Sequence, residues 1–311
     1  MNSLREAVPE YLAMRKSLGF QLYHASVELL NFVQYLEEHG SASYITVRDV
    51  LGWVQQPSSL QPATWAKRLC VVRGFARYRS AFDPRTEIPP RTLLSFRPRR
   101  IQPYIYSRQA VLRLMNTARK MRTRGSLRPW TYYCLFGLLS VTGLRIGEAR
   151  NLKFDDVDLE NGVLTIRGAK FGQWRVVPVH PSTVKALEDY RKRRERALAG
   201  RTSPYFFVSG RGTRLHRGTV YSTFYALSRH IGLRGPTASH GPRLHDLRYR
   251  FAHETLLQSY RAGENPEKRL PLLSTYLGHV NFADTYWYLR AWPELMNAAM
   301  QRVDERWGDG V

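Results

Sequence analysis

The sequence predicts a mainly α-helical protein that contains one small antiparallel β-sheet. Apolar residues recur at helical spacing in the N-terminal third, as at Leu29, Val33 and Leu36. Two valine-containing runs flank a glycine-bearing loop within residues 163–179, which is the pattern of a β-hairpin. Beyond Ser182 the chain returns to helical periodicity, and it shows neither internal repeats nor low-complexity segments. Helices therefore dominate on both sides of the predicted sheet.

The N-terminal segment predicts a small bundle of helices. The first clear helix ends at Gly40, and its apolar positions are Leu29, Leu30, Val33 and Leu36. Thr46 and Asp49 form a capping box that opens a short helix over residues 50–55. A further helix carries the apolar residues Trp65, Leu69, Val72, Phe75 and Ala76. The proline pair at residues 89–90 ends the bundle.

A basic, proline-containing segment, residues 96–104, follows the bundle. It is too polar for a core, and its prolines favour an extended chain, so we expect a linker that lies along nucleic acid. The second domain opens with a helix from about Ser107 and a more apolar helix over residues 130–141. The predicted hairpin of residues 163–179 carries Lys170 in its loop.

The charge of the chain indicates a polyanionic partner. The formal net charge is +23 over 311 residues, which exceeds what solubility requires, so nucleic acid is the expected partner. No acidic residue lies between Glu87 and Glu148. The basic residues of that interval indicate a surface that faces phosphates or, as the alternative, one that is merely solvated. They are Arg91, Arg97, Arg99, Arg100, Arg108, Arg113, Arg119, Lys120, Arg122, Arg124, Arg128 and Arg145.

The cysteines and the apolar runs bear on the cellular compartment. Cys70 and Cys134 lie far apart in apolar surroundings, which predicts two buried, reduced thiols and neither a disulfide framework nor a zinc site. No apolar run reaches membrane-spanning length, and the N-terminal residues lack the apolar core of a signal peptide. We expect a cytoplasmic protein that associates with the nucleoid and not with a membrane.

Several basic residues and one tyrosine could act on a phosphodiester. In chain order they are Arg145, Lys170, His245, Arg248, His279 and Tyr288. A phenol hydroxyl is a weak nucleophile at neutral pH, so a reactive tyrosine needs cations that stabilise the charge that develops during attack. Taken singly, each candidate would more often be a capping, turn or surface residue. The aromatic residues around Tyr288 could likewise be the apolar side of a helix.

Two segments fit the pattern His-x-x-Arg, residues 240–243 and residues 245–248. The second leads into an apolar run, so a helix can hold both side chains on one face at positions i and i+3. A glycine and a proline follow His240, and such a loop is a poorer base for a catalytic group. We therefore favour His245 and Arg248.

Order and context make this set specific, and here the sequence resembles the tyrosine recombinases, the integrase family of DNA-rearranging enzymes. The resemblance extends from Ser107 to about Trp307. The matching positions are Arg145 within the segment Thr-Gly-Leu-Arg-Ile-Gly-Glu of residues 142–148, Glu148 as its acidic neighbour, Lys170 before Pro178, the pair His245 and Arg248, His279 after Leu277 and Gly278, and Tyr288.

The sequence also departs from the usual family pattern. The interval between Arg248 and His279 is long, and residues 260–267 resemble an inserted loop. Tyr249 and the following arginine stand where His-Thr is common. Residues 284–289 resemble the subgroup of these recombinases that transposable elements carry.

The resemblance implies a domain organisation. It predicts an N-terminal helical bundle of the core-binding, SAM-like type over residues 1–95, which binds DNA and matches the family only in size, helical content and position. A basic linker over residues 96–106 follows. An α+β catalytic domain of the tyrosine-recombinase type, with a C-terminal helix, occupies residues 107–311.

The resemblance also implies the roles of the residues. Tyr288 attacks a phosphodiester and forms a 3′-phosphotyrosyl link, and Lys170 protonates the leaving 5′ oxygen as general acid. The phosphate oxygens are held by Arg145, Arg248 and His279. His245 assists proton transfer at the tyrosine or orients the phosphate. No cofactor is expected, and the cations already supply the charge that a metal pair would bring.

The expected function is site-specific DNA recombination or transposition without ATP or metal. Two alternatives are a non-catalytic DNA-binding protein with the same fold and a topoisomerase of type IB. The partner is double-stranded DNA, and the resemblance leaves room for companion recombinases. Strand exchange requires four cleavages, so we expect a monomer when free and a homotetramer on synapsed DNA. Apolar residues at helical spacing within residues 295–303 predict an amphipathic helix. The resemblance implies that this helix docks on a neighbouring subunit, and the alternative is a helix packed on its own domain.

Overall fold

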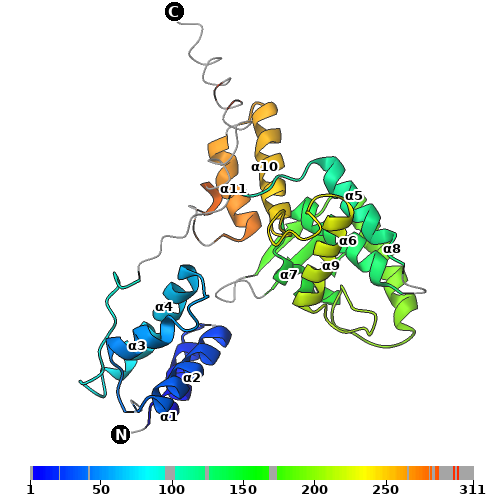
Figure 1. The fold of residues 1–311 in the computed structure, drawn as a ribbon. Helices are drawn as coiled ribbons and strands as arrows, with labels where there is room; N and C mark the ends of the chain where they lie inside the picture. Colours follow the sequence, from blue (N-terminus) through cyan, green and yellow to red (C-terminus); the bar gives the residue numbers. More distant parts are fainter. Residues whose placement is uncertain are drawn as a thin grey trace, which may run out of the picture. The chain divides into compact units, whose positions relative to one another are not determined.

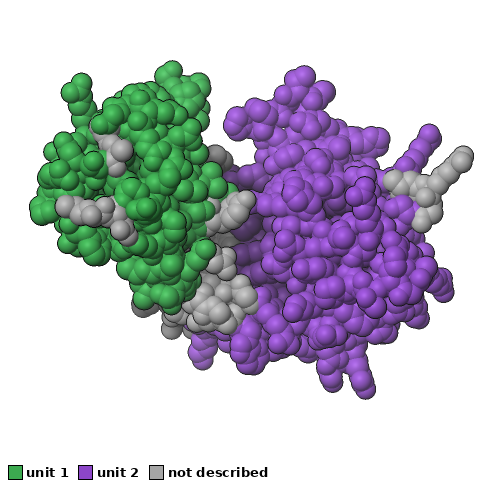
Figure 2. All heavy atoms as spheres, turned by 90° about the horizontal axis from the view of Figure 1, so that it is seen from below, with its two compact units in different colours: residues 1–101 green, residues 102–311 purple. Residues whose placement is uncertain are grey.

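The computed structural model describes residues 3–20, 22–40, 43–94, 102–122, 126–167, 174–264, 266–279, 281, 284–286, 297 and 300. The chain divides into two compact units, Met1–Ile101 and Gln102–Val311, which Figure 2 colours green and purple. Each unit contains its own cluster of buried apolar residues, so each has the core of a separate domain.

Unit 1 is built from helices in its described part. They are α1 (Leu4–Ser17), α2 (Tyr23–Glu38), α3 (Val47–Val54) and α4 (Pro62–Arg79). The Thr46 side chain accepts a hydrogen bond from the Asp49 amide. Thr46 is therefore the N-cap, and α3 begins three residues earlier than the predicted Val50.

Helical phase decides which predicted apolar positions of unit 1 are buried. Leu29, Val33 and Leu36 of α2 are buried, whereas Leu30 is 42% exposed and lies outside the buried stripe. The same reasoning corrects one cysteine. Cys70 follows the buried Leu69 on α4 and faces solvent, while Cys134 is buried as expected. An apolar sequence neighbourhood alone does not fix the direction of a helical side chain.

Unit 2 combines helices with a three-stranded sheet (Figure 1). Its helices are α5 (Arg108–Arg119), α6 (Arg128–Thr142), α7 (Ile146–Asn151), α8 (Pro181–Leu198), α9 (Arg217–His230), α10 (Asp246–Arg261) and α11 (Pro266–Leu277). A short 3-10 helix, η1 (Phe154–Asp156), precedes the strands β1 (Val157–Asp158), β2 (Val163–Ile166) and β3 (Arg175–Pro178).

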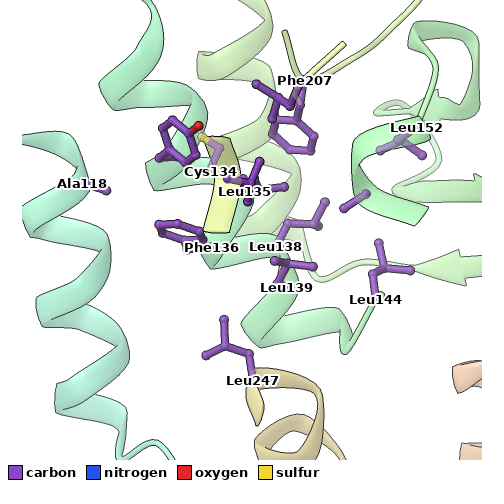
Figure 3. Close-up of a cluster of buried hydrophobic side chains, with 14 of the residues drawn as sticks. Ala118, Cys134, Leu135, Phe136, Leu138, Leu139, Leu144, Leu152, Phe207 and Leu247 are labelled. Atoms are coloured by element: carbon purple, nitrogen blue, oxygen red, sulfur yellow. The ribbon is translucent and has the colours of Figure 1, made fainter. Parts of the chain in front are cut away.

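Helix α6 is the centre of unit 2. It is buried on nearly every face, which agrees with its nearly continuous apolar sequence. Figure 3 shows Leu135, Phe136 and Leu139 of α6 among side chains that come from other elements, Ala118 and Leu247 among them. The helix ends at Gly143, whose φ of +61° is left-handed. That turn carries the chain directly into Leu144 and Arg145 at the start of α7.

The antiparallel sheet has the order β1-β2-β3, and its register is fixed by a buried face. Leu164, Ile166 and Val177 are buried, and they alternate with more exposed neighbours. The pairing of Ile166 with Arg175 places Arg175 at the end of the hairpin. The hairpin loop, residues 168–173, lies outside the described residues.

The interval between α10 and α11 is shorter than the sequence predicts. Helix α10 continues to Arg261, and α11 begins at Pro266. The left-handed Gly263 turns the chain after α10, and the two helices occupy part of residues 260–267, where an inserted loop was expected. Among the described residues, no helix has both the length and the apolar character needed to cross a membrane.

Candidate active site

Arg145 occupies the sharp turn between α6 and α7. Its side chain donates from Nη2 to the Gly278 carbonyl at 3.0 Å and from Nη1 to Glu148 Oε1 at 2.9 Å. The turn depends on Gly143, because a Cβ there would lie 2.6 Å from Phe251 Cδ1. The absence of a side chain at Gly143 thus lets α6 end against α10, and this packing directs Arg145 toward the end of α11.

Arg248 lies in the first turn of α10 and is 2% exposed. Its Nη1 donates to the Gly143 carbonyl and its Nη2 to the Leu277 carbonyl, both at 2.7 Å. Arg145 Nη1 also donates to the Leu277 carbonyl, at 3.4 Å. The two arginines therefore meet at the C-terminal end of α11, where the helix dipole and the terminal carbonyls favour cations.

His279 follows α11 immediately. The left-handed Gly278, at φ +66°, turns the chain, and the His279 amide donates to the Ser274 carbonyl at 3.0 Å. The ring is fixed by a 2.7 Å hydrogen bond between Nδ1 and Oγ1 of Thr285, a residue that is 1% exposed. This bond ties the histidine to the short helical turn of residues 284–286, which precedes Tyr288 in the sequence.

The sequence predicted that His245 and Arg248 lie on one helix. The structure places His245 at the N-cap of α10, just outside the helix. The helix begins one residue later because Asp246 accepts a hydrogen bond from the Arg243 amide at 2.9 Å, which closes the turn before it. His245 nevertheless has helical dihedral angles, and its carbonyl accepts the Arg248 amide at 3.1 Å. Its ring packs edge-on against Tyr249, with centroids 5.4 Å apart.

Burial and nearby arginines set the protonation of both histidines. Burial, followed by the nearby charge of Arg248, lowers the pKa of His245 from 6.5 to about 4. Burial, followed by Arg248 and Arg145, likewise lowers the pKa of His279 to about 4. Both imidazoles are therefore neutral at pH 7. A neutral imidazole can accept a proton on one nitrogen or donate a hydrogen bond from the other.

Glu148 is joined by an arginine to which the sequence gave no role. Arg175 of β3 donates from Nη1 to Oε1 of Glu148 at 3.1 Å and from Nη2 to Oε2 at 2.8 Å. Its Nε donates to the Tyr276 carbonyl at 2.8 Å. Burial by itself would raise the pKa of Glu148, but the hydrogen bond and charge of Arg175, together with Arg145, lower it overall. The glutamate is therefore ionised.

The described part of the site carries an excess of positive charge. Arg145 and Arg175 share the carboxylate of Glu148, and Arg248 meets Arg145 at the Leu277 carbonyl. Arg145 is the accessible cation, since 40% of its side chain is exposed, against 11% for Arg175. Such an arrangement can bind an oxyanion. No group of three or more potential metal-ligating side chains occurs among the described residues.

The structure brings together four of the six predicted residues. Arg145, Arg248 and His279 meet at the end of α11, and His245 is close enough for Arg248 and Arg145 to lower its pKa. Lys170 and Tyr288 lie outside the described residues. The predicted docking helix over residues 295–303 does too, apart from Asn297 and Met300.

Comparison with known proteins identifies the family of this chain. The model of the phage integrase family matches residues 105–294. The chain belongs to the phage integrase family. This confirms the family membership that the motifs around Arg145 and Tyr288 predicted. The family match covers all six predicted site positions, from Arg145 to Tyr288.

Related sequences cover almost the whole chain. It is 56% identical to a protein of Sinorhizobium fredii named as an integrase/recombinase, y4rB, over 99% of each chain. It is 35% identical to a second such protein of that organism, y4rE, over 96% of each chain. The tyrosine recombinase XerA of Pyrococcus furiosus is 29% identical over 54% of this chain and 52% of XerA.

Solved structures of this family share the fold. The integrase of the transposon Tn1549, in complex with transposon right-end DNA, has a TM-score of 0.66 at 16% identity and covers 97% of this chain and 99% of its own. XerH bound to its difH substrate has a TM-score of 0.63 at 20% identity, covering 88% and 77%. The predicted fold class, mainly α with a small antiparallel sheet, is confirmed.

Proposed function

We propose that this protein is a site-specific DNA recombinase or transposase that cleaves and rejoins DNA through a 3′-phosphotyrosyl intermediate. The observation that carries the proposal is the meeting of Arg145 and Arg248 at the Leu277 carbonyl, next to His279. Three chain segments that are distant in sequence converge there on a site with excess positive charge. A structural ion pair would instead balance its charges.

The proposed chemistry assigns one step to each group. Tyr288 Oη attacks the phosphorus, forms a P–O bond and loses its proton, for which neutral His245 is a suitable acceptor. The bond to the 5′ oxygen breaks, and Lys170 supplies the proton to that oxygen. Arg145 and His279 donate hydrogen bonds to the non-bridging oxygens as negative charge grows on them.

Energy conservation follows from the covalent link. The phosphotyrosyl ester retains the energy of the broken phosphodiester, so the 5′ hydroxyl of a partner strand can attack it and release Tyr288 without ATP. Arg145 and Arg248 supply positive charge at the phosphate, and the reaction should therefore proceed in the presence of a metal chelator.

The remaining assignments extend the proposal to the whole chain. Residues 1–95 form a DNA-binding bundle, residues 96–106 a linker along the DNA, and residues 107–311 the catalytic domain. The net charge of +23 supports DNA as the partner of both domains. One nucleophilic tyrosine per chain and four cleavages per exchange support a homotetramer on synapsed DNA. A related structure is a λ integrase tetramer bound to a Holliday junction.

A trapped covalent adduct tests the proposal. The protein is incubated with a nicked suicide substrate in a chelator, and the adduct is resolved on a denaturing gel. We expect an adduct with the wild-type protein and none with Tyr288→Phe, because only the phenol oxygen of residue 288 forms the ester. Tyr286→Phe is the matched control, since Tyr286 lies two residues away and is 55% exposed. Loss of the adduct in Tyr286→Phe but not in Tyr288→Phe would reassign the nucleophile.

A further inference from the structure

Among the described arginines at the end of α11, Arg175 is the one to which the proposed chemistry gives no step. All of its described hydrogen bonds are made to groups of the protein. Its two Nη atoms donate to the carboxylate of Glu148, and its Nε donates to the carbonyl of Tyr276. A guanidinium engaged at all three nitrogens is a fixed structural cation.

The four hydrogen bonds of Glu148 divide evenly between two arginines. Oε1 accepts from Arg145 Nη1 and from Arg175 Nη1, while Oε2 accepts from the Arg145 amide and from Arg175 Nη2. The carboxylate is 9% exposed, so solvent screens its charge weakly. Without Arg175, Glu148 would balance Arg145 alone, and the Arg145–Glu148 pair would present no net charge to a phosphate.

Arg175 also shapes the turn that carries His279. Its guanidinium lies against Gly278, where a Cβ would come within 2.7 Å of Nη1 and 3.0 Å of Cζ. The carbonyl that it binds, Tyr276, is three residues before His279. Gly278 therefore serves two needs, a left-handed φ of +66° and close contact with an arginine. The glycine of the Leu-Gly-His motif and Arg175 form one packing unit.

We propose that Arg175 is a positioning residue for DNA cleavage, which balances the charge of Glu148 and holds the end of α11, so that Arg145 keeps its charge for the phosphate and His279 keeps its place. The inference rests on the proposed function. It assigns Arg175 no contact with DNA: the arginine acts through Arg145 and through the α11 turn.

The test measures single-turnover cleavage of the suicide substrate at saturating DNA, with DNA affinity measured separately. Arg175→Gln should lower the cleavage rate ~100-fold, the size of effect that small misplacement of reacting groups produces. Its DNA affinity should change by less than about threefold, because many other basic residues contribute to phosphate contacts. Arg175→Lys, which keeps the charge but not the paired donors, should fall between the wild type and Arg175→Gln.

A double variant separates this role from simple loss of folding. Because Glu148→Gln removes the charge that Arg175 balances, Arg175→Gln/Glu148→Gln should cleave faster than Arg175→Gln alone. Arg194→Gln is the matched control, since Arg194 is also buried and donates to the Ser203 and Tyr205 carbonyls of another part of unit 2. It should lower stability and leave the cleavage rate at saturating DNA unchanged.

The outcomes distinguish this inference from the proposed function. If the wild-type protein forms no adduct, the proposed function fails. If the wild type forms the adduct and Arg175→Gln cleaves at the wild-type rate, or the double variant is no faster than the single one, the proposed function stands and the role of Arg175 is wrong. Should Arg175→Gln fail to fold, the decision passes to Arg175→Lys, and a wild-type rate in that folded variant overturns the inference.

Discussion

Arginine–carboxylate pairs occur in both units, but they differ in burial and in stoichiometry. In unit 1, Arg5 pairs with Glu37 between α1 and α2, and the two side chains are 52% and 36% exposed. In unit 2, the carboxylate of Glu148 is 9% exposed and is shared by Arg145 and Arg175. The pair in unit 1 is neutral and exposed to solvent, while the cluster around Glu148 carries a positive charge and is largely enclosed.

This difference shows which feature of an arginine marks a functional site. The chain has 48 lysines and arginines, so the residue type by itself carries little information. At the end of α11, the arginines exceed the carboxylates and are held by backbone carbonyls. Carbonyls orient a guanidinium without cancelling its charge. The site is therefore fixed in geometry before any anion arrives, which is the condition for electrostatic catalysis.

The largest expected effect is on cleavage by the two arginines that meet at Leu277. Arg145→Ala and Arg248→Ala should each lower the cleavage rate by orders of magnitude, roughly 10³-fold, because each removes charge stabilisation specific to the transition state. DNA affinity should remain within a few fold of the wild-type value, since other basic residues maintain the ground-state contacts. Gel-shift titration and single-turnover cleavage measure the two quantities. A parallel loss of affinity and cleavage would make these arginines part of the general electrostatic surface.

Stability should separate the same two variants. Arg248 is 2% exposed, and its loss leaves the Gly143 carbonyl without the hydrogen bond it accepts. We expect Arg248→Ala to lower the free energy of unfolding by ~3 kcal/mol, as for other buried charged hydrogen bonds. Arg145 is 40% exposed, so Arg145→Ala should lower the free energy of unfolding by less than about 1 kcal/mol. Urea unfolding tests this order, and equal losses would contradict the burial argument.

Much of the fold could be predicted because its signals are local. The apolar run of α6 and the valines of β3 predicted an apolar helix and a hairpin, and both are present. The errors arose at element ends and in helical phase. Asp246 starts α10 after His245, Gly263 shortens the connection to α11, and the phase of α4 exposes Cys70.

The site could be predicted only in part, for a physical reason. The order and spacing of Arg145, Arg248 and His279 are properties of the sequence. The role of Arg175 is not, since its partners Glu148 and Tyr276 lie 27 and 101 residues away and become neighbours only through packing. Its place three residues before Pro178 is the sole local signal. Hydrogen bonds that join distant segments leave no periodic pattern in a sequence.

A smaller effect concerns pH and the buried histidine. The folded state holds the pKa of His245 at about 4, below the ordinary 6.5. Between pH 4 and pH 6.5, His245 is therefore protonated in the unfolded chain but neutral in the folded chain. This contribution to stability is complete above pH 6.5 and is lost as the pH falls toward 4. When the pH falls from 7 to 5, the free energy of unfolding should therefore decrease by ~2 kcal/mol less in His245→Asn than in the wild type.

Urea unfolding at pH 7, 6 and 5 measures that difference, and the wild-type comparison cancels the titration of all other groups. His230, on the exposed end of α9, offers a matched substitution that removes an imidazole outside the site. If the free energy of unfolding depends on pH in the same way in His245→Asn and the wild type, the fold does not lower the pKa of His245.

The smallest effect is expected at the surface pair of unit 1. Arg5 and Glu37 form two hydrogen bonds, of which the Nε–Oε1 bond is 2.8 Å long, and each raises or lowers the pKa of the other in the direction that favours the ion pair. Both side chains are exposed, however, so water and salt screen their attraction and the ordering of two long side chains offsets it. Arg5→Ala should leave the melting temperature and the cleavage rate indistinguishable from the wild type. A clear loss of cleavage in Arg5→Ala, with DNA affinity unchanged, would mean that a balanced, exposed arginine can matter as much as the enclosed ones at the end of α11, and the contrast between the two units would fail.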